Sequence, residues 1–404
     1  TYIIGGGAAG FFAAITCAGQ NPDTPVILLE RGGELLNKVR ISGGGRCNVT
    51  HACFDVRQLL GFYPRGHREL NGPFSRFGPR DTIEWFERRG VVLKTEADGR
   101  MFPDTDDSAT IVNCLRQAAR QAGVEVKTHA RVSGLNPVSG GWQIHLTEEA
   151  APIEARQVLM ATGSNLAAWR MIEELGHKVV PPVPSLFTFN ISDPRLHELS
   201  GLSVADAHVQ IGDTKLKASG PLLITHWGLS GPGILRISAW GARELHAMDY
   251  RFTLKINWLG NTSLIETGDR LRDIKASEGK KQVSTHARFG LPLRLWQRLC
   301  QYSDIPEEMR WADLDKKRIA ALSAQLCEGQ FQAEGKSTYK DEFVTAGGID
   351  LKEVNLKTFE SKLHPGLFFA GEVLDIDAVT GGFNFQAAWT SGWIAGMEMA
   401  GRKN

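Results

Sequence analysis

The stretch TYIIGGGAAGFFAAI, residues 1–15, decides the fold class of this sequence. A short apolar strand, residues 2–4, runs into a loop in which Gly5, Gly7 and Gly10 match the pattern G-x-G-x-x-G, and an apolar helix follows. In such a loop the first glycine permits a tight turn. The second lets a pyrophosphate approach the backbone, and the third lets the helix pack on the sheet. The N–H groups at the start of the helix then face the phosphates.

A second predicted strand, residues 26–29, ends at Glu30, which lies 20 residues after Gly10. A carboxylate at this place accepts hydrogen bonds from a ribose diol. We therefore expect a dinucleotide-binding site at this edge of the sheet. The alternative is a glycine-rich turn without a ligand, in which Glu30 is only a surface residue.

A second glycine cluster, KVRISGGGRCN, occupies residues 38–48. Consecutive glycines allow backbone conformations in which successive N–H groups form an anion-binding nest. Lys38, Arg40 and Arg46 add positive charge on both sides. We expect a second loop along the same cofactor, the alternative being a flexible surface loop with solvated cations. Cys47 is interpreted as a small packed residue rather than a reactive thiol.

The far end of the chain repeats this pattern. The predicted strand 367–370 ends in Gly371 and Glu372, and Gly381 and Gly382 open an apolar helix after a loop. The dipole of this helix favours negative charge at its N-terminus. A reduced flavin ring carries such charge, so the placement suits it. An ordinary C-terminal helix packed on the sheet is the alternative.

Strands and helices alternate between the two ends. The apolar positions of residues 108–122 predict a helix, and residues 124–127, 141–146 and 158–161 read as strands. The order predicts an α/β fold with a doubly wound, Rossmann-like sheet. No second G-x-G-x-x-G follows residue 10, so a dedicated NAD(P)H module is not expected.

The middle of the chain differs from both ends. Five short alternating segments, residues 185–191, 204–211, 215–218, 222–225 and 250–256, predict a small barrel or sandwich. Residues 228–233 are expected to interrupt it and to open a helix. Residues 264–277, 292–301 and 313–327 are predicted to be helices. Residues 181–184 are expected to be a stiff linker into this insert. The chain is expected to return to the sheet near residues 342–348. The predicted division is therefore a first part of the dinucleotide-binding domain (1–184), a β-barrel subdomain (185–262), a helical subdomain (263–335) and a second part of the dinucleotide-binding domain (336–404).

Composition excludes several classes of protein. The 404 residues are 42% hydrophobic and 23% charged, as in ordinary globular proteins. Lys and Arg (46) nearly balance Asp and Glu (45), so no global field draws nucleic acid or an anionic membrane. No apolar run is long enough to span a bilayer, and no signal peptide is expected. The six cysteines form no C-x-x-C pair, which argues against a disulfide framework, a zinc site and a redox dithiol, and predicts a cytoplasmic location.

These residues resemble the BaiN/YhiN-like flavoproteins, a family of NAD(P)/FAD-dependent oxidoreductases that includes aminoacetone oxidase. The resemblance covers nearly the whole chain. It rests on GGGAAG at 5–10, Glu30, KVRISGGGRCN at 38–48, ATG at 161–163, GPLLITHWGLSGPGIL at 220–235, FVTAGGI at 343–349 and GEVLDIDAVTGGFNFQAAWTSG at 371–392.

The resemblance implies FAD, rather than NAD, at the first glycine loop, and a fold similar to the glutathione-reductase-like enzymes with an inserted domain. It also implies a set of cofactor contacts: Gly5, Gly7, Ala8, Glu30, Lys38, Ser42, Arg46, Cys47, Asn48, Val132, Thr162, Gly163, Gly371, Glu372, Phe383 and Asn384. Neighbours in the same segments complete the expected set: Ala9, Gly10, Arg31, Gly43, Ala161 and Gly382.

The expected function is that of an FAD-dependent oxidoreductase that transfers hydride through a non-covalent flavin to or from a small organic substrate, with NAD(P)H as a candidate transient electron donor. The alternatives are an oxygen-using amine oxidase, a flavin-binding redox sensor and a tRNA-modifying flavoprotein. A tRNA-modifying flavoprotein would use residues 269–298, which contain eight Lys and Arg residues and only three Asp and Glu residues. A solvated helical face is the preferred reading, so we expect no nucleic-acid partner. No catalytic residue is assigned, and His226 is interpreted as structural rather than as a proton donor.

Overall fold

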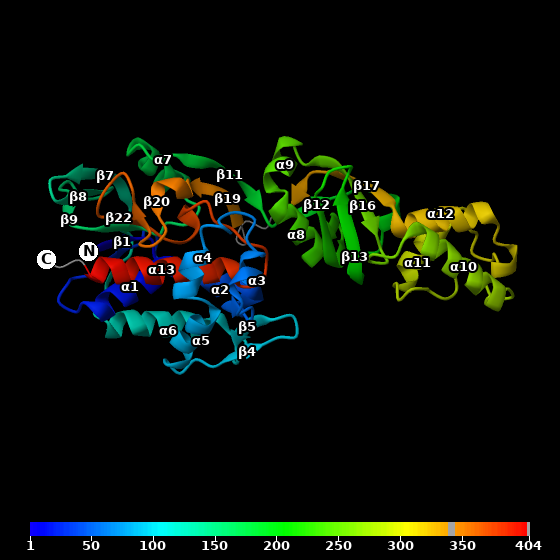
Figure 1. Ribbon diagram of the computed structural model, residues 1–404, viewed down its shortest axis with the longest axis horizontal. Coiled ribbons are helices and arrows are strands. Elements are labelled where there is room, and N and C mark those ends of the chain that lie inside the picture. The colour runs from blue at the N-terminus through cyan, green and yellow to red at the C-terminus, as the bar shows by residue number, and fades with distance from the viewer. Residues whose placement is uncertain (338–343, 402–404) are drawn as a thin grey trace. The chain divides into compact units, whose positions relative to one another are not determined.

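The computed structural model describes residues 1–337 and 344–401, and these residues divide into two compact units (Figure 1). The first unit combines residues 1–183 with the described chain from residue 344 onward, and the second holds residues 184–337. Glu342 and Phe343, which the sequence places near the return to the sheet, lie outside the described residues.

A seven-stranded sheet forms the centre of the first unit, in the order β20-β21-β22-β10-β1-β2-β6. The five strands from β22 to β6 run parallel, and their short apolar segments are largely buried, as expected for a parallel sheet between helices. The strand bounds are β1 Tyr2–Ile4, β2 Ile27–Leu29, β6 Glu125–Lys127, β10 Val158–Met160, β20 Val354–Asn355, β21 Glu360–Ser361 and β22 Leu367–Phe369. The predicted α/β fold with a Rossmann-like sheet is thus confirmed.

Two helices from opposite ends of the chain lie side by side in this unit (Figure 1). They are α1 (Ala8–Gln20) and α13 (Phe383–Gly401). The backbone of Gly392 packs directly on α1, since an added Cβ would lie 2.6 Å from the carbonyl oxygen of Ala9. Gly396 packs in the same way, with its hypothetical Cβ 2.6 Å from the carbonyl oxygen of Ala13. Glycines four residues apart lie on one helix face, so α13 approaches α1 more closely than any side chain would permit.

Three smaller sheets and several helices complete the first unit. The sheets are β3 (Thr50–His51) with β5 (Arg100–Pro103) and β4 (Leu93–Thr95); β7 (Val132–Val138) with β8 (Gly141–Leu146) and β9 (Ile153–Ala155); and β11 (Val179–Ser185) with β19 (Val344–Ile349). The helices are α2 (Asn37–Gly45), α3 (Val56–Leu60), α4 (Asn71–Arg76), α5 (Pro79–Glu87), α6 (Ser108–Gln121) and α7 (Leu166–Glu174).

The second unit is built on an antiparallel sheet in the order β17-β16-β13-β14-β15-β12-β18. Its two outermost strands, β17 and β18, follow one another in the chain with only Gly335 between them. The two edges of the sheet are therefore connected directly through residues 329–337. The strand bounds are β12 Thr188–Asn190, β13 Ser203–Ile211, β14 Lys217–Thr225, β15 Gly228–Ser230, β16 Arg251–Asn257, β17 Gly329–Glu334 and β18 Lys336–Ser337.

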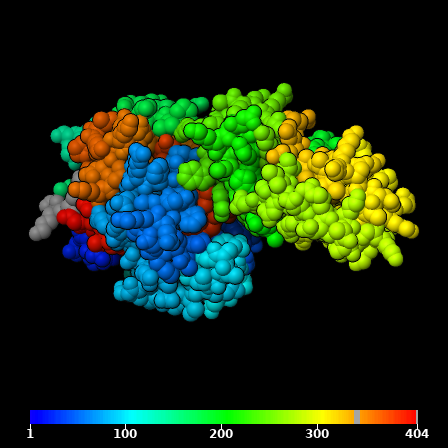
Figure 2. All heavy atoms as spheres, turned by 45° about the vertical axis from the view of Figure 1, so that its right-hand side comes forward, coloured from blue at the N-terminus to red at the C-terminus, as the bar shows by residue number. Residues whose placement is uncertain are grey.

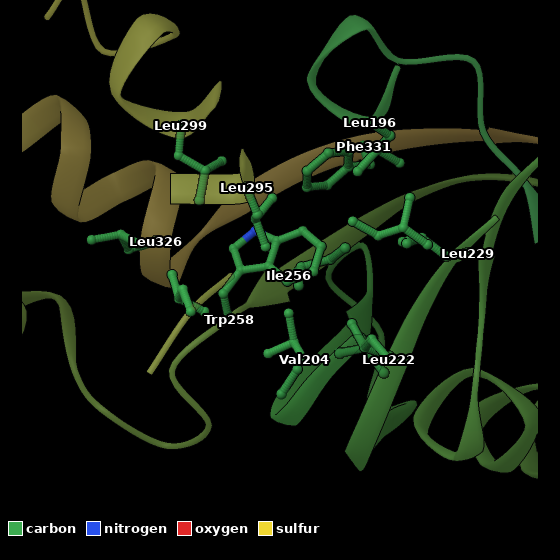
Figure 3. Packing of buried hydrophobic residues seen from close by; sticks show 14 of the residues in the cluster. Leu196, Val204, Leu222, Leu229, Ile256, Trp258, Leu295, Leu299, Leu326 and Phe331 are labelled. Atoms are coloured by element: carbon green, nitrogen blue, oxygen red, sulfur yellow. The ribbon is translucent and has the colours of Figure 1, made fainter. Parts of the chain in front are cut away.

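One hydrophobic core joins this sheet to the helices of the second unit (Figure 3). Ile256 and Phe331 come from the sheet, and Leu295, Leu299 and Leu326 come from the helices. All five side chains are fully buried. The helix bounds are α8 Pro232–Trp240, α9 Ala242–Ala247, α10 Leu264–Glu278, α11 Leu293–Gln301 and α12 Lys316–Cys327.

Three local predictions were wrong in whole or in part. Residues 181–184, expected to be a linker, do contain the boundary between the two units, but they belong to the strand β11, which pairs with β19. Residues 215–218 and 222–225, two of the five alternating segments expected as separate strands, belong to the single strand β14, which begins at residue 217. The pairing of β13 with β14 shifts between Val204 and Ala207, and this irregularity lies opposite Gly220 and Pro221, where a proline is tolerated. Residues 228–230 are the strand β15 rather than a break before α8.

The contact between α1 and α13 generates the first prediction. Gly392→Ala should lower the free energy of unfolding by about 1–3 kcal/mol, because the added Cβ would force the two helices apart. Denaturant titration of the protein measures this change. Gly19→Ala on α1 is the matched control, since an added Cβ there meets no atom within 4 Å. Equal stability of the two variants would contradict the proposed close packing.

Candidate functional site

The three glycines of the first loop differ in what surrounds them in the structure. Gly5 has a φ of +115°, and an added Cβ would lie 2.3 Å from the carbonyl oxygen of Ala161. A Cβ on Gly10 would lie 2.0 Å from the carbonyl oxygen of Gly5. Both glycines are therefore required by the packing of the chain itself. A Cβ on Gly7 meets no atom within 4 Å.

Gly7 therefore borders open space at the start of α1. Its backbone is extended, with φ −91° and ψ −170°, which any residue adopts. The first N–H groups of a helix have no partner within the helix, and α1 has no side-chain cap. The backbone N–H groups of Ala8 and Ala9 are the first two of this helix. The open space beside Gly7 therefore lies where the positive end of the helix favours an anionic group.

Glu30 follows β2 directly and is held beside the glycine loop. Its Oε2 accepts a hydrogen bond from the backbone N–H of Gly6 at 2.7 Å, and its Oε1 accepts one from Gly32 at 3.0 Å. The carboxylate is thus fixed in position, with further lone pairs left to accept hydroxyl groups. Arg31 is exposed next to it. Residue 130 donates to the carbonyl oxygen of Glu30, which brings the segment before Val132 to the same place.

The second glycine cluster is not a simple loop, in contrast to the prediction. Residues 37–41 form a helical turn, and the left-handed conformation begins at Gly43 (φ +59°, ψ 29°) and Gly44 (φ +68°, ψ 36°). Ser42 donates through Oγ to the carbonyl oxygen of Val39 at 3.0 Å. Gly43 to Gly45 are exposed, and added Cβ atoms on Gly44 and Gly45 meet nothing. The backbone N–H groups of this turn thus border solvent.

The cation of Arg46 is already neutralised by the protein. Its Nη1 lies 2.7 Å from Glu96 and 3.3 Å from Asp106, and its guanidinium lies over the ring of Phe102 at 4.0 Å. The hydrogen bond to Glu96 and the charge of both acids raise the pKa of Arg46. A side-chain contact from Arg46 to a cofactor would therefore have to compete with these carboxylates.

Cys47 is fully buried, with a left-handed φ of +60°. Burial raises the pKa of its thiol to about 12, although a hydrogen bond with Ser42 acts in the opposite direction. The thiol is therefore protonated at neutral pH, which supports the interpretation of Cys47 as a packed residue.

Asn48 joins the two ends of the chain. In the amide orientation that satisfies both groups, its nitrogen donates to the carbonyl oxygen of Thr50 at 3.1 Å, and its oxygen accepts from the N–H of Gly382 at 3.0 Å. Gly382 has a φ of +87°, and an added Cβ would lie 2.6 Å from the carbonyl oxygen of Thr50. The start of α13 is therefore fixed against the segment that follows the second glycine cluster.

The loop before α13 is held by its own residues. Asn384 donates to the carbonyl oxygen of Ala378 at 3.1 Å and accepts from the N–H of Ala378 at 2.9 Å. Phe383 stacks on Phe62, with ring centres 4.2 Å apart, and its carbonyl oxygen accepts from the hydroxyl of Tyr63 at 2.6 Å. These contacts order the residues around the N-terminus of α13.

Several residues of this region were missed by sequence reasoning. Arg65 forms a bidentate ion pair with Asp377, whose carboxylate is fully buried. The ring of His51 stacks on Phe383 at 4.6 Å, and burial lowers the pKa of His51. Gln386, also buried, accepts hydrogen bonds from the hydroxyls of two threonines. The only local signal for any of them was the position of Asp377, two residues after another acid, Asp375, in the segment GEVLDID.

The ends of four parallel strands bring the predicted residues together. Gly5 follows β1, Glu30 follows β2, Ala161 to Gly163 follow β10, and Gly371 and Glu372 follow β22. Parallel strands end at one edge of a sheet, and ligands of open α/β sheets bind in the crevice outside that edge. Lys38 on α2 reaches across to Glu372, with 2.5 Å between Nζ and Oε2.

This edge fits an extended dinucleotide with a flavin. Two helix N-termini, those of α1 and α13, flank it, and Gly7 leaves room for a close approach. The hydroxyl of Thr162 is buried and has no hydrogen-bond partner among the described residues. Across residues 1–337 and 344–401, no group of three His, Cys, Asp or Glu could hold a metal ion, and no helix is long and apolar enough to cross a membrane. All six cysteines are free.

The fold and the site define an α/β protein of the dinucleotide-binding class with an inserted second unit. The chain belongs to the HI0933-like family, because the model of the HI0933-like protein Rossmann domain matches residues 1–398. It is a flavoprotein and an FAD-dependent oxidoreductase of this family, as the sequence predicted.

Proteins of known function resemble the chain over its whole length. It is 30% identical to the ribosomal RNA dihydrouridine synthase of Escherichia coli (strain K12), across 100% of this chain and 98% of the relative. It is 28% identical to the 3-dehydro-bile acid delta(4,6)-reductase of Clostridium scindens, across 99% and 98%. Among solved structures, the 3-ketosteroid-delta4-(5alpha)-dehydrogenase of Rhodococcus jostii RHA1 has a TM-score of 0.53 at 15% identity, over 99% of this chain and 96% of that one. This last likeness concerns the fold alone.

The different roles of the glycines generate a prediction about the cofactor. Gly7→Ala should leave the stability of the apoprotein unchanged, because its Cβ meets no protein atom, and should weaken FAD binding by at least about tenfold, because the Cβ enters the space of the pyrophosphate. Gly10→Ala should instead destabilise the fold. Thermal unfolding of the apoproteins and titration with FAD measure the two effects. Full FAD affinity of Gly7→Ala would contradict the phosphate assignment.

The buried thiol generates a prediction about reactivity. At about pH 8 an alkylating reagent should modify Cys47 far more slowly than Cys114, because only the thiolate reacts and Cys47 is the more buried of the two. Mass spectrometry of digested protein measures both rates, and unfolding in denaturant should equalise them. Equally rapid modification of Cys47 in the folded protein would mean that its thiol is accessible.

Proposed function

We propose that this protein is a flavin-dependent reductase that adds two hydrogens to a carbon–carbon double bond conjugated to a carbonyl group. The support is the pair of full-length relatives, which are named as a dihydrouridine synthase and a delta(4,6)-reductase. Their substrates differ in size, but both names denote saturation of such a bond. The proposal therefore assigns the hydride transfer expected from the sequence to one class of reaction, the saturation of a conjugated carbon–carbon double bond.

We propose that FAD lies along the edge formed by the four parallel strands. Gly7 and the start of α1 would hold the pyrophosphate, and Glu30 the adenosine ribose. The start of α13, beside Asn48 and Phe383, would hold the flavin ring. When bound, the flavin supplies the hydride chemistry, while the protein supplies position and electrostatic field.

The start of α13 is the feature that would stabilise the reduced flavin, the form that gives hydride to the substrate. A reduced flavin is anionic, and the N-terminus of a helix of 19 residues stabilises negative charge close to it. Asn384 and Asn48 fix this N-terminus from both sides through hydrogen bonds to backbone groups. The dipole is thus preorganised and needs no rearrangement when charge develops.

The substrate is proposed to be a small unsaturated carbonyl compound. The Lys and Arg side chains of residues 269–298 are exposed or partly exposed on the second unit, one face of which is seen in Figure 2. Their cations are largely engaged within the chain: Arg272 pairs with Asp269, and both Lys281 and Arg288 pair with Glu278. Such a surface is less suited to a phosphate backbone than the count of cations suggests.

A uracil base in RNA is the second candidate substrate. The specific observation that favours it is that the relatives from Escherichia coli and Haemophilus influenzae are both named ribosomal RNA dihydrouridine synthases. A uracil contains the same conjugated carbonyl group as an unsaturated ketone. This candidate stands beside the tRNA alternative that the sequence left open, and the small-molecule proposal must be tested against it.

We also propose NAD(P)H as a transient electron donor. For the insert, we propose two subdomains, a barrel (185–262) and a helical part (263–335). The direct connection of the two outermost strands of the antiparallel sheet supports the barrel, and these strands, residues 329–337, overlap the range proposed for the helical part. No second dinucleotide-binding loop occurs in the sequence, so the nicotinamide would have to bind without such a module.

The test uses FAD-loaded protein without oxygen, supplied with NADH or NADPH and with either a steroid enone or ribosomal RNA transcripts. We expect oxidation of the nicotinamide that depends on the substrate, and a gain of two hydrogens in one product by mass spectrometry. Gly7→Ala protein should show both effects only in proportion to the FAD that it retains. Protein that retains FAD but saturates neither substrate would contradict the proposed reaction. Peroxide formation from a small amine under oxygen would support the amine oxidase instead.

A further inference from the structure

An ion pair crosses the edge of the sheet where the cofactor is expected. Lys38 lies in the first turn of α2, which follows β2, and Glu372 lies in the short helix η4 (Gly371–Val373), which follows β22. In the sheet, β10 and β1 separate β22 from β2. The bond between Nζ and Oε2, 2.5 Å long, therefore spans the ends of two strands.

The residues beneath the pair are those of the cofactor crevice. An added Cβ on Gly163, directly after β10, would lie 3.7 Å from Oε2 of Glu372. On the other side, the N–H of Leu36 donates to the carbonyl oxygen of Gly6 at 2.8 Å, which fixes the start of α2 beside the glycine loop. The pair thus lies between the segment of Gly163 and the segment that follows the first glycine loop.

The backbones at both ends of the pair are anchored, but the side chains are movable. The N–H of Gly371 donates to Oγ of Ser391 at 2.9 Å, and that of Ala370 donates to the carbonyl oxygen of Met160 at 3.0 Å. The side chain of Lys38 is 50% exposed and that of Glu372 is 18% exposed. The pair is therefore partly exposed to solvent, and added salt weakens it.

We infer that Lys38 and Glu372 form a strap that closes across the cofactor crevice and slows the dissociation of FAD. The inference rests on FAD binding at this edge but not on the identity of the substrate. Its alternative is that each residue contacts FAD separately and that the pair itself contributes nothing. The two cases differ in what an exchange of the two charges does.

The experiment measures the dissociation rate of FAD from loaded protein, from the rise in flavin fluorescence after dilution. Lys38→Met and Glu372→Gln should each raise the rate about fivefold, the upper range for a partly exposed ion pair. The exchange of charges, Lys38→Glu with Glu372→Lys, should bring the rate back toward that of the unaltered protein. Added salt, from about 0.1 to 1 M, should speed release from the unaltered protein but not from the single variants.

Lys178→Met is the matched control, because Lys178 pairs with Asp350 at 3.2 Å in the same unit and neither residue is among the expected cofactor contacts. Its dissociation rate should not change. Unchanged rates in both single variants, or a charge-exchanged protein that releases FAD at least as fast as they do, would overturn the strap. Near-ultraviolet circular dichroism of each variant verifies the fold. Protein that takes up no FAD at all would instead refute the cofactor assignment.

Discussion

The close packing of α1 on α13 is the constraint on which the rest of the first unit depends. Gly392 and Gly396 present bare backbone to Ala9 and Ala13, so the two helices meet along one face. The N-terminus of each helix lies at the carboxyl edge of the parallel sheet. Two positive helix ends, contributed by residues more than 370 positions apart, are therefore held at a fixed separation. An extended dinucleotide needs such a fixed separation.

The rest of the site follows from this arrangement. Glu30 is held by backbone donors, and the start of α13 is held by Asn48, so the groups expected to contact FAD are positioned before any ligand arrives. Preorganised donors and acceptors lose little entropy on binding. The buried ion pair of Arg65 and Asp377 adds rigidity on the side of the loop before α13. The Lys38–Glu372 pair is the more exposed part of the same edge.

The features that could be predicted from the sequence are those formed by residues that lie close together in the chain. The first glycine loop, Glu30 and the glycine pair before α13 each occupy a few consecutive residues, and the α/β class follows from their order. The helical turn at residues 37–41 could not be distinguished from a loop, because one turn beside three glycines has no periodicity. The pairing of Arg65 with Asp377 joins residues 312 positions apart, so no local pattern indicates it. By contrast, the alternation in residues 329–334 was a readable strand signal that was missed.

The central claim is that both ends of the chain bind one flavin. A crystal structure of the protein with FAD measures this most directly. The account predicts the pyrophosphate within hydrogen-bond distance of the N–H groups that begin α1, and the flavin ring beside Gly382 and Phe383. FAD density that contacts only one of these two helix starts, or crystals grown with saturating FAD that contain none, would contradict it.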